Sequence, residues 1–194
     1  MSGLSINVAL VGMTGVGKST LVNILKGSEV AEVNNDSKPC TLGATCYEVV
    51  ESGTTYHIWD TRGLNEASWR RFNWFPWVSL DANAQLKNLL SGGQKGSPEI
   101  DLVLLCVGGE KIGIQAHWEA YTKIPTSIKV AVVVTRMGDI GSSQWRQTCK
   151  DTAKLKGIEL DTNVMEGVPK FRDLQEQKAR DCRDKILALI SRCC

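Results

Sequence analysis

The sequence has no long hydrophobic run, little net charge and no internal repeat or low-complexity segment. No apolar stretch reaches the ~18 residues that a membrane-spanning helix needs. The first residues lack a charged region followed by an apolar core, so we expect no secretory signal. The formal net charge of +2 is too small to indicate nucleic acid or an acidic membrane as a partner.

Metal-binding cysteine patterns are also missing. The seven cysteines show no C-x-x-C and no Cys/His spacing of the kind that holds a metal. Cys46, Cys106 and Cys149 fall within predicted strands or helices, where a small buried thiol is the simplest explanation. We therefore expect a reduced, cytoplasmic protein without a metal cage of its own.

The most informative stretch is Gly12–Ser19, which fits the P-loop pattern G-x-x-x-x-G-K-[ST]. An apolar run at 6–11 predicts a buried strand before it, and apolar spacing over 20–26 predicts a helix after it. In this arrangement main-chain N–H groups surround a phosphate chain, Lys18 reaches the β/γ-phosphates and Ser19 ligates Mg²⁺. The alternative is a glycine-rich turn with a chance lysine, which the flanking strand and helix make less favourable.

Strands and helices alternate along the rest of the chain. Together with the P-loop, this pattern predicts an α/β fold, a three-layer α/β/α P-loop NTPase domain that takes up residues 1–194 as a single domain, with a mainly parallel sheet and one antiparallel hairpin strand. The predicted strands are 6–11, 47–50, 54–59, 100–107 and 128–134, and the predicted helices are 20–26, 82–90, 115–123, 142–156 and 171–190. Residues 157–168 are ambiguous between a loop and a short final strand.

Candidate metal and γ-phosphate residues follow the phosphate loop. Asp60 closes an apolar strand, which is the Walker-B position, and Gly63 would offer a main-chain N–H to the γ-phosphate. In the polar connection before the hairpin, Thr41 and Thr45 are candidates for a hydroxyl on Mg²⁺. The alternative is that both threonines simply begin a strand.

An aromatic and arginine-rich segment, residues 68–80, follows directly. It either packs this loop against the core or forms a nucleotide-controlled contact surface, since interface centres favour aromatic residues and arginine. We therefore keep residues 62–78 as a candidate surface for a protein partner.

Three motifs together resemble a known family: Gly12–Ser19, Asp60–Gly63 and Val133–Arg136. They are similar to the GTPases related to septins, the GIMAP immunity-associated proteins and the Toc chloroplast-import receptors. The string Trp59–Glu66 is similar to one in small fungal G-domain proteins. The resemblance covers roughly residues 6–140. It implies a Ras-like G domain with GTP/GDP as ligand and Mg²⁺ as cofactor.

The resemblance also implies residue roles. Residues of the phosphate loop and its helix would contact the phosphates: Gly12, Thr14, Gly15, Val16, Gly17, Lys18, Ser19 and Thr20. Metal ligation would come from Ser19, Thr41 and Asp60, and catalysis would involve Lys18, Thr41 and Gly63. Thr135, Arg136 and Asp139 would meet the base, with the arginine stem covering its face.

The sequence departs from the family pattern in ways that matter for selectivity and catalysis. Strict spacing puts the guanine-reading aspartate at 138, but this residue is Gly138 and the aspartate is Asp139. No later motif of the S-A-[KL] type is evident, so the other side of the base pocket stays unassigned. Leu64 stands where Ras-like proteins have a water-orienting glutamine, and Thr14 narrows the site. We expect slow unassisted hydrolysis.

These observations predict a GTP-binding switch protein with slow, Mg²⁺-dependent hydrolysis of GTP to GDP and phosphate. The alternatives are a P-loop kinase of a nucleotide or small molecule using ATP, and a nucleotide-binding interaction module that hydrolyses nothing. Related families dimerise across the nucleotide face, and a partner's Arg62, Arg70 or Arg71 could then complete the site. Cys193 and Cys194 resemble the prenylated C-terminal cysteines of Rab proteins, and we expect membrane attachment only if they are lipidated.

Overall fold

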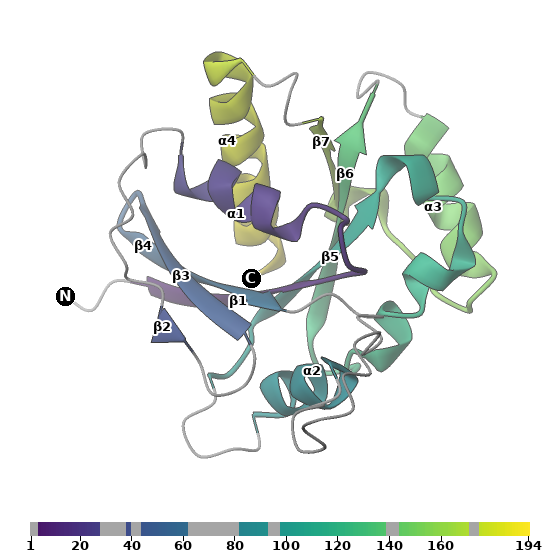
Figure 1. Cartoon of the computed structure of the whole chain (residues 1–194), viewed down its shortest axis with the longest axis horizontal. Coiled ribbons are helices and arrows are strands. Elements are labelled where there is room, and N and C mark those ends of the chain that lie inside the picture. Colours follow the sequence, from purple (N-terminus) through teal and green to yellow (C-terminus); the bar gives the residue numbers. More distant parts are fainter. Residues whose placement is uncertain are drawn as a thin grey trace, which may run out of the picture.

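The strands form a single twisted sheet (Figure 1). The computed structural model describes residues 4–27, 38–39, 44–61, 82–92, 98–138, 144–170 and 175–194. In this part of the chain the sheet has seven strands in the order β2-β3-β4-β1-β5-β6-β7. The strands are β1 (Leu4–Val11), β2 (Lys38–Pro39), β3 (Ala44–Glu51), β4 (Thr54–Thr61), β5 (Leu102–Gly108), β6 (Lys129–Met137) and β7 (Met165–Pro169).

Pairing within the sheet is mainly parallel. Strands β4, β1, β5, β6 and β7 run in the same direction, whereas β3 is antiparallel to β4 and to the short β2. The predicted three-layer α/β fold with one antiparallel hairpin strand is therefore confirmed. The carboxyl ends of β1, β4, β5, β6 and β7 meet at one edge of the sheet, which is where ligands of such folds bind.

Helices cover both faces of the sheet (Figure 1). Helices α1 (Lys18–Lys26) and α4 (Glu176–Cys193) lie side by side on one face, and α2 (Ala82–Leu90) and α3 (Gln144–Lys154) cover the other. Every residue of β5 is buried, because the helices of both layers pack against this central strand. The near-continuous apolar run of β5 is thus explained by burial on two faces.

Two sequence predictions need correction or completion. The predicted helix at 115–123 is wrong: the chain forms two separate 3₁₀ turns, η2 (Gln115–Trp118) and η3 (Tyr121–Lys123). Trp118 is fully buried and its indole N–H donates to the carbonyl of Ile112 at 3.1 Å, which favours tight turns over one continuous helix. The ambiguous stretch 157–168 contains a further 3₁₀ turn, η4 (Thr162–Val164), and most of β7.

Within the described ranges, no helix combines the length and apolar character that crossing a bilayer requires. The same ranges hold no group of three or more His, Cys, Asp or Glu side chains arranged to bind a metal ion. His117, a residue of η2, is buried, and its Nδ1 atom has no hydrogen-bond partner among the described residues. Burial lowers the pKa of His117, and nearby Lys111 lowers it further.

Candidate functional site

The phosphate loop connects β1 to α1 and passes close to the end of β5. A Cβ atom at Gly12 would lie 2.5 Å from the carbonyl oxygen of Cys106, so only glycine fits this position. Gly17 has φ 101° and caps the N-terminus of α1, a left-handed conformation that favours glycine. The Gly12–Gly17 spacing is therefore a steric requirement of the loop in this fold.

Thr135, near the end of β6, ties the phosphate loop to the neighbouring strands. Its buried hydroxyl donates to the carbonyl of Val16 and lies 3.4 Å from the carbonyl of Val107. Its side chain is also the nearest neighbour of Gly17, where a Cβ atom would lie 3.5 Å from the Cβ of Thr135. The sequence placed Thr135 at the base; the structure shows that it contacts the loop itself.

Lys18, the first residue of α1, lies inside the loop and is 7% exposed. Its ammonium group donates to the carbonyls of Gly12 at 3.1 Å and of Met13 at 3.3 Å. A buried ammonium needs hydrogen-bond acceptors or an anion to offset its desolvation. The loop carbonyls accept from two of the three N–H groups of the ammonium, which leaves one donor for an anion at the loop.

Asp60 and Ser19 bring two hard oxygen donors together at the N-terminus of α1. The Ser19 hydroxyl donates to Oδ2 of Asp60 at 2.9 Å, and Oδ1 of Asp60 is buried with no hydrogen-bond partner in the described part of the chain. Burial raises the pKa of Asp60, while the Ser19 hydrogen bond and the charge of Lys18 act in the opposite direction. A carboxylate oxygen without a partner beside a hydroxyl fits the coordination preference of Mg²⁺.

The end of β4 is held in register by its own hydrogen bond. The hydroxyl of Thr61 donates to the carbonyl of Leu10 in β1 at 2.6 Å, which places Asp60 beside the phosphate loop. Thr45 lies directly opposite Asp60 in the β3–β4 ladder and so lies at the start of β3, as the alternative interpretation of this threonine proposed. The exposed Thr14 and Gly15 form the outer part of the loop.

Several predicted site residues lie outside the described residues. These are Thr41, Gly63 and Asp139, together with Leu64 and the three candidate arginines Arg62, Arg70 and Arg71. The aromatic segment 68–80 lies outside them as well. Their roles stay predictions.

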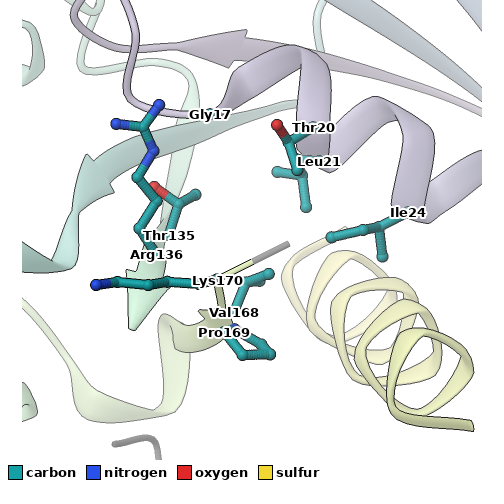
Figure 2. Close-up of a pocket in the computed structure, with 9 residues that line it drawn as sticks. All are labelled: Gly17, Thr20, Leu21, Ile24, Thr135, Arg136, Val168, Pro169 and Lys170. Atoms are coloured by element: carbon teal, nitrogen blue, oxygen red, sulfur yellow. The ribbon is translucent and has the colours of Figure 1, made fainter. Parts of the chain in front are cut away.

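A cavity of about 450 Å³ opens between α1 and the ends of β6 and β7 (Figure 2). Figure 2 shows side chains of α1 facing those at the end of β7 across the cavity, with β6 on the third side. The lining residues are Gly17, Thr20, Leu21, Ile24, Thr135, Arg136, Val168, Pro169 and Lys170. The cavity is continuous with the phosphate loop through Gly17 and Thr20, and it lies where the sequence predicts the base beside Thr135 and Arg136.

The sequence motifs did not predict the β7 side of this cavity. Val168, Pro169 and Lys170 occupy the side that stayed unassigned because no S-A-[KL] motif was evident. The available signal was the ambiguous stretch 157–168, since a parallel strand added next to β6 must end at the same edge. Figure 2 shows the Lys170 side chain extended beneath Arg136 with its ammonium at the end away from α1.

Arg136 adopts an unusual backbone conformation. Its φ of 58° is in the left-handed region, which residues other than Gly, Asn and Asp rarely adopt. The Arg136 side chain is exposed. Such strain persists only where the surroundings impose it, and it concentrates at ligand-binding positions. The conformation coincides with the β6–β7 register shift between Val134 and Met137.

Comparisons with known proteins agree with this geometry. The family described as "50S ribosome-binding GTPase" matches residues 7–136. The tRNA modification GTPase MnmE of Neisseria meningitidis is 46% identical over 61 residues, a match that covers 31% of this chain and 13% of that protein. The matched segment is thus a small part of that relative.

Two solved structures share the fold at low sequence identity. A dimerization-deficient mutant of Toc33 from Arabidopsis thaliana gives a TM-score of 0.63 at 18% identity, covering 97% of this chain and 84% of that one. Era in complex with MgGDPNP and a segment of 16S ribosomal RNA gives a TM-score of 0.58 at 19% identity, covering 97% and 57%. The family match spans about two thirds of the chain and includes the phosphate loop, Asp60 and Thr135. The chain therefore belongs to the 50S ribosome-binding GTPase family.

Proposed function

We propose that this chain is a GTP-binding switch protein that hydrolyses GTP slowly and requires Mg²⁺. The observation that carries the proposal is the placement of three features at one edge of the sheet. The glycine-built loop with Lys18 lies in the middle, the Asp60–Ser19 pair lies beside it, and the cavity beside Thr135 and Arg136 continues from it. A nucleoside triphosphate with its metal ion needs this spatial order: a metal site, then a phosphate site, then a base site.

In this proposal the phosphates lie against main-chain N–H groups at the positive N-terminus of α1. Lys18 then turns toward the β- and γ-phosphates, because a charged phosphate oxygen is a stronger acceptor than the carbonyls of Gly12 and Met13 that it contacts now. Along the rest of the phosphate path lie Gly12, Thr14, Gly15, Val16, Gly17 and Thr20.

The metal would be held by Ser19 and Asp60, with Thr41 as the third protein ligand. A bound cation would occupy the unpartnered Oδ1 region of Asp60 and offset the desolvation that raises the pKa of this carboxyl. Mg²⁺ supplies charge neutralisation between the phosphates. Gly63 would offer its N–H at the γ-phosphate, and the Thr41 and Gly63 segments would rearrange when that phosphate is lost.

The base would occupy the cavity between α1 and β7. Leu21, Ile24 and Val168 provide apolar surface, and the stems of Arg136 and Lys170 provide cover for the faces of a flat ring. Asp139 would reach the guanine edge despite its displacement by one residue. Guanine selectivity depends on this displaced carboxylate, so it is the first property to measure.

We also propose that the protein forms a homodimer. Toc33, one of the structures that share this fold, dimerises, since a mutant of it is dimerization-deficient. A homodimer across the nucleotide face would let a partner's Arg62, Arg70 or Arg71 complete the site, and residues 62–78 would form the switch-dependent contact surface. Residues 1–194 would act as one G domain in the cytoplasm, with membrane attachment only after lipidation of Cys193 and Cys194.

One observation favours a second candidate, a nucleotide-binding module that hydrolyses nothing. Leu64 cannot orient a water molecule, since its side chain has neither donor nor acceptor. A kinase is not favoured, because the family match is to GTPases.

Titration calorimetry with GTP, GDP and ATP in Mg²⁺ tests the proposal. We expect GTP and GDP to bind and ATP to bind at least about tenfold more weakly, the effect of one mispaired base edge.

Lys18→Ala should weaken GTP binding by roughly tenfold to a hundredfold, the range expected for a lost charge-assisted hydrogen bond. Phosphate release measured across protein concentrations separates the switch from the non-hydrolysing module. Equal affinity of wild type and Lys18→Ala for every nucleotide would refute the proposal.

A further inference from the structure

A glutamate outside the cavity contacts a residue that lines it. Glu110 belongs to the 3₁₀ turn η1 (Gly109–Lys111), which follows β5, and its carboxylate oxygen Oε1 lies 3.1 Å from the ammonium of Lys170. Lys170 directly follows β7. The ion pair therefore spans the end of β6, which lies between β5 and β7 in the sheet.

A glycine makes this crossing feasible. A Cβ atom at Gly109 would lie 3.1 Å from the carbonyl oxygen of Thr135 and 3.3 Å from that of Arg136. The η1 backbone thus lies directly against the end of β6, and the next residue, Glu110, can reach the far side. The contact between η1 and β6 fixes where the carboxylate is presented.

Lys170 is the side chain on which this contact acts. Its ammonium is directed away from α1, toward Glu110, while the rest of the residue lines the cavity (Figure 2). Without the carboxylate, a half-exposed lysine would sample many rotamers in water, because its four-carbon stem is flexible and its head is strongly hydrated. Anchoring the head holds the stem along the cavity.

We propose that Glu110 is a positioning residue for base binding, because its carboxylate holds the Lys170 stem against the face of the bound base. The inference rests on the proposed function, since it assigns the cavity to the base. It predicts a specific pattern: loss of Glu110 weakens ligands that carry a base and spares ligands made of phosphate alone. A glutamate acting only through its negative charge would have the opposite effect, because its removal would strengthen binding of every anion.

The test compares GDP with inorganic pyrophosphate by titration calorimetry in Mg²⁺ at low ionic strength. Exposed ion pairs contribute little, so Glu110→Gln should lower GDP affinity by about two- to fivefold. Pyrophosphate affinity should stay the same or rise slightly. The loss in GDP affinity should shrink in about 1 M salt, where charges are screened within a few ångströms.

A second variant separates the contribution of the apolar stem of Lys170 from that of its ammonium group. Lys170→Met keeps a straight apolar side chain and removes the charge, so Glu110 can no longer hold it. We expect the double variant Glu110→Gln/Lys170→Met to bind GDP as Lys170→Met alone does. Glu176→Gln is the matched control, because Glu176 forms an exposed ion pair with Arg180 at 2.8 Å on α4 and should leave both affinities unchanged.

The outcomes separate the inference from the function on which it rests. Unchanged GDP affinity in Glu110→Gln, or parallel changes for GDP and pyrophosphate, overturns the positioning role and leaves nucleotide binding intact. An equal loss from Glu110→Gln in the Lys170→Met background also overturns it. Wild-type protein that binds pyrophosphate but not GDP, or neither ligand, overturns the proposed function and the positioning role together.

Discussion

The phosphate loop and the cavity beside it differ in what determines their shapes. The loop depends on main-chain conformation and on buried contacts, such as the packing of Gly12 against Cys106 and the hydrogen bond from Thr135 to Val16. The cavity rim depends on the stems of exposed or half-exposed side chains, Arg136 and Lys170. The phosphate loop therefore has a single permitted backbone arrangement, whereas the side chains of the cavity rim can adopt other rotamers.

This difference predicts how each region responds to substitution. Close-packed interiors do not absorb even one added methyl group without strain, and a buried carbonyl left without its donor is costly. Exposed side chains at a rim are surrounded by water, which can replace the hydrogen bonds and fill the space that a substitution removes. We therefore expect changes in the loop to have large effects on stability and binding together, and changes at the rim to have graded effects on base binding alone.

Gly12→Ala should have the largest effect. The added Cβ would lie 2.5 Å from the Cys106 carbonyl oxygen, so the loop must move away from β5. We expect a loss of about 1–3 kcal/mol in unfolding free energy, the range for overpacking a filled site, and a loss of more than about tenfold in GDP affinity. Thermal unfolding and calorimetry measure both.

Gly92→Ala is the control for Gly12→Ala. Gly92 has φ 59°, but no atom of the described residues lies within 4 Å of the position of its Cβ, so this change introduces backbone strain without a clash among them. It should reduce stability by about 1 kcal/mol and leave GDP affinity unchanged. Equal GDP affinity in Gly12→Ala and wild type would show that the loop adjusts as readily as the rim.

Thr135→Val should have the next largest effect. Valine keeps the shape of threonine but removes the donor to Val16, which leaves a buried carbonyl without a partner. We expect a loss of about 1–3 kcal/mol in unfolding free energy and a several-fold loss of affinity for both GDP and pyrophosphate. Thr135→Ser, which retains the hydroxyl, should bind pyrophosphate as wild type does. Loss of GDP affinity alone would instead place Thr135 with the rim.

Asp60→Asn tests the metal side of the loop through pH. Burial raises the pKa of Asp60, so the folded protein holds its proton to higher pH than the unfolded chain does. This carboxyl therefore favours unfolding once the pH rises above about 4, the ordinary aspartate value. Nucleotide-free Asp60→Asn should melt at a higher temperature than wild type at pH 7, and the difference should shrink as the pH falls toward 4.

Magnesium and nucleotide should reverse the ranking of the melting temperatures of Asp60→Asn and wild type. With Mg²⁺ and GTP present, wild type should melt at the higher temperature, because only the carboxylate can hold the cation strongly. An Asp60→Asn protein that kept the full Mg²⁺ dependence of GTP binding would contradict the metal role of Asp60.

Of the Gly12, Thr135, Asp60 and Arg136 substitutions, Arg136→Asn should have the smallest effect, and it should affect the rim only. Asparagine tolerates the left-handed backbone at this position but lacks the long stem. We expect stability to stay within about 0.5 kcal/mol of wild type, as for most surface changes. GDP affinity should fall by roughly threefold to tenfold, which corresponds to about 1 kcal/mol of lost apolar contact. Pyrophosphate affinity should not change; a parallel fall would mean that Arg136 acts as a charge on the phosphates.

The loop could be predicted from the sequence to the residue. The motif Gly12–Ser19 lies between β1 and α1 as expected, and Asp60 lies at the end of β4 beside it. These positions were predictable because local rules set them: an apolar strand, a glycine that alone fits a tight turn, and a helix start with its exposed N–H groups. The β3–β4 hairpin and α2 follow from the same kind of local pattern.

The rim was predicted only in part. Thr135 and Arg136 were expected at the base, but Lys170 and Glu110 were not, since neither belongs to a local motif. Lys170 acquires its place because β7 adds to the sheet next to β6, a pairing between segments distant in the sequence. The error at 115–123 has a similar origin, because the burial of Trp118 in the core beneath α2 and α3 outweighs the local helical preference.

By itself, the sequence determined the alternation of strands and helices, the glycine loop and the carboxylate at the end of β4, because each depends on residues adjacent in the chain. Only the tertiary structure decided that Thr135 contacts the loop, that Lys170 lines the cavity and that Glu110 reaches Lys170 over the end of β6. These contacts depend on the order of β5, β6 and β7 in the sheet. That order is set by the packing of the two helical layers, a global free-energy balance that no short stretch of sequence encodes.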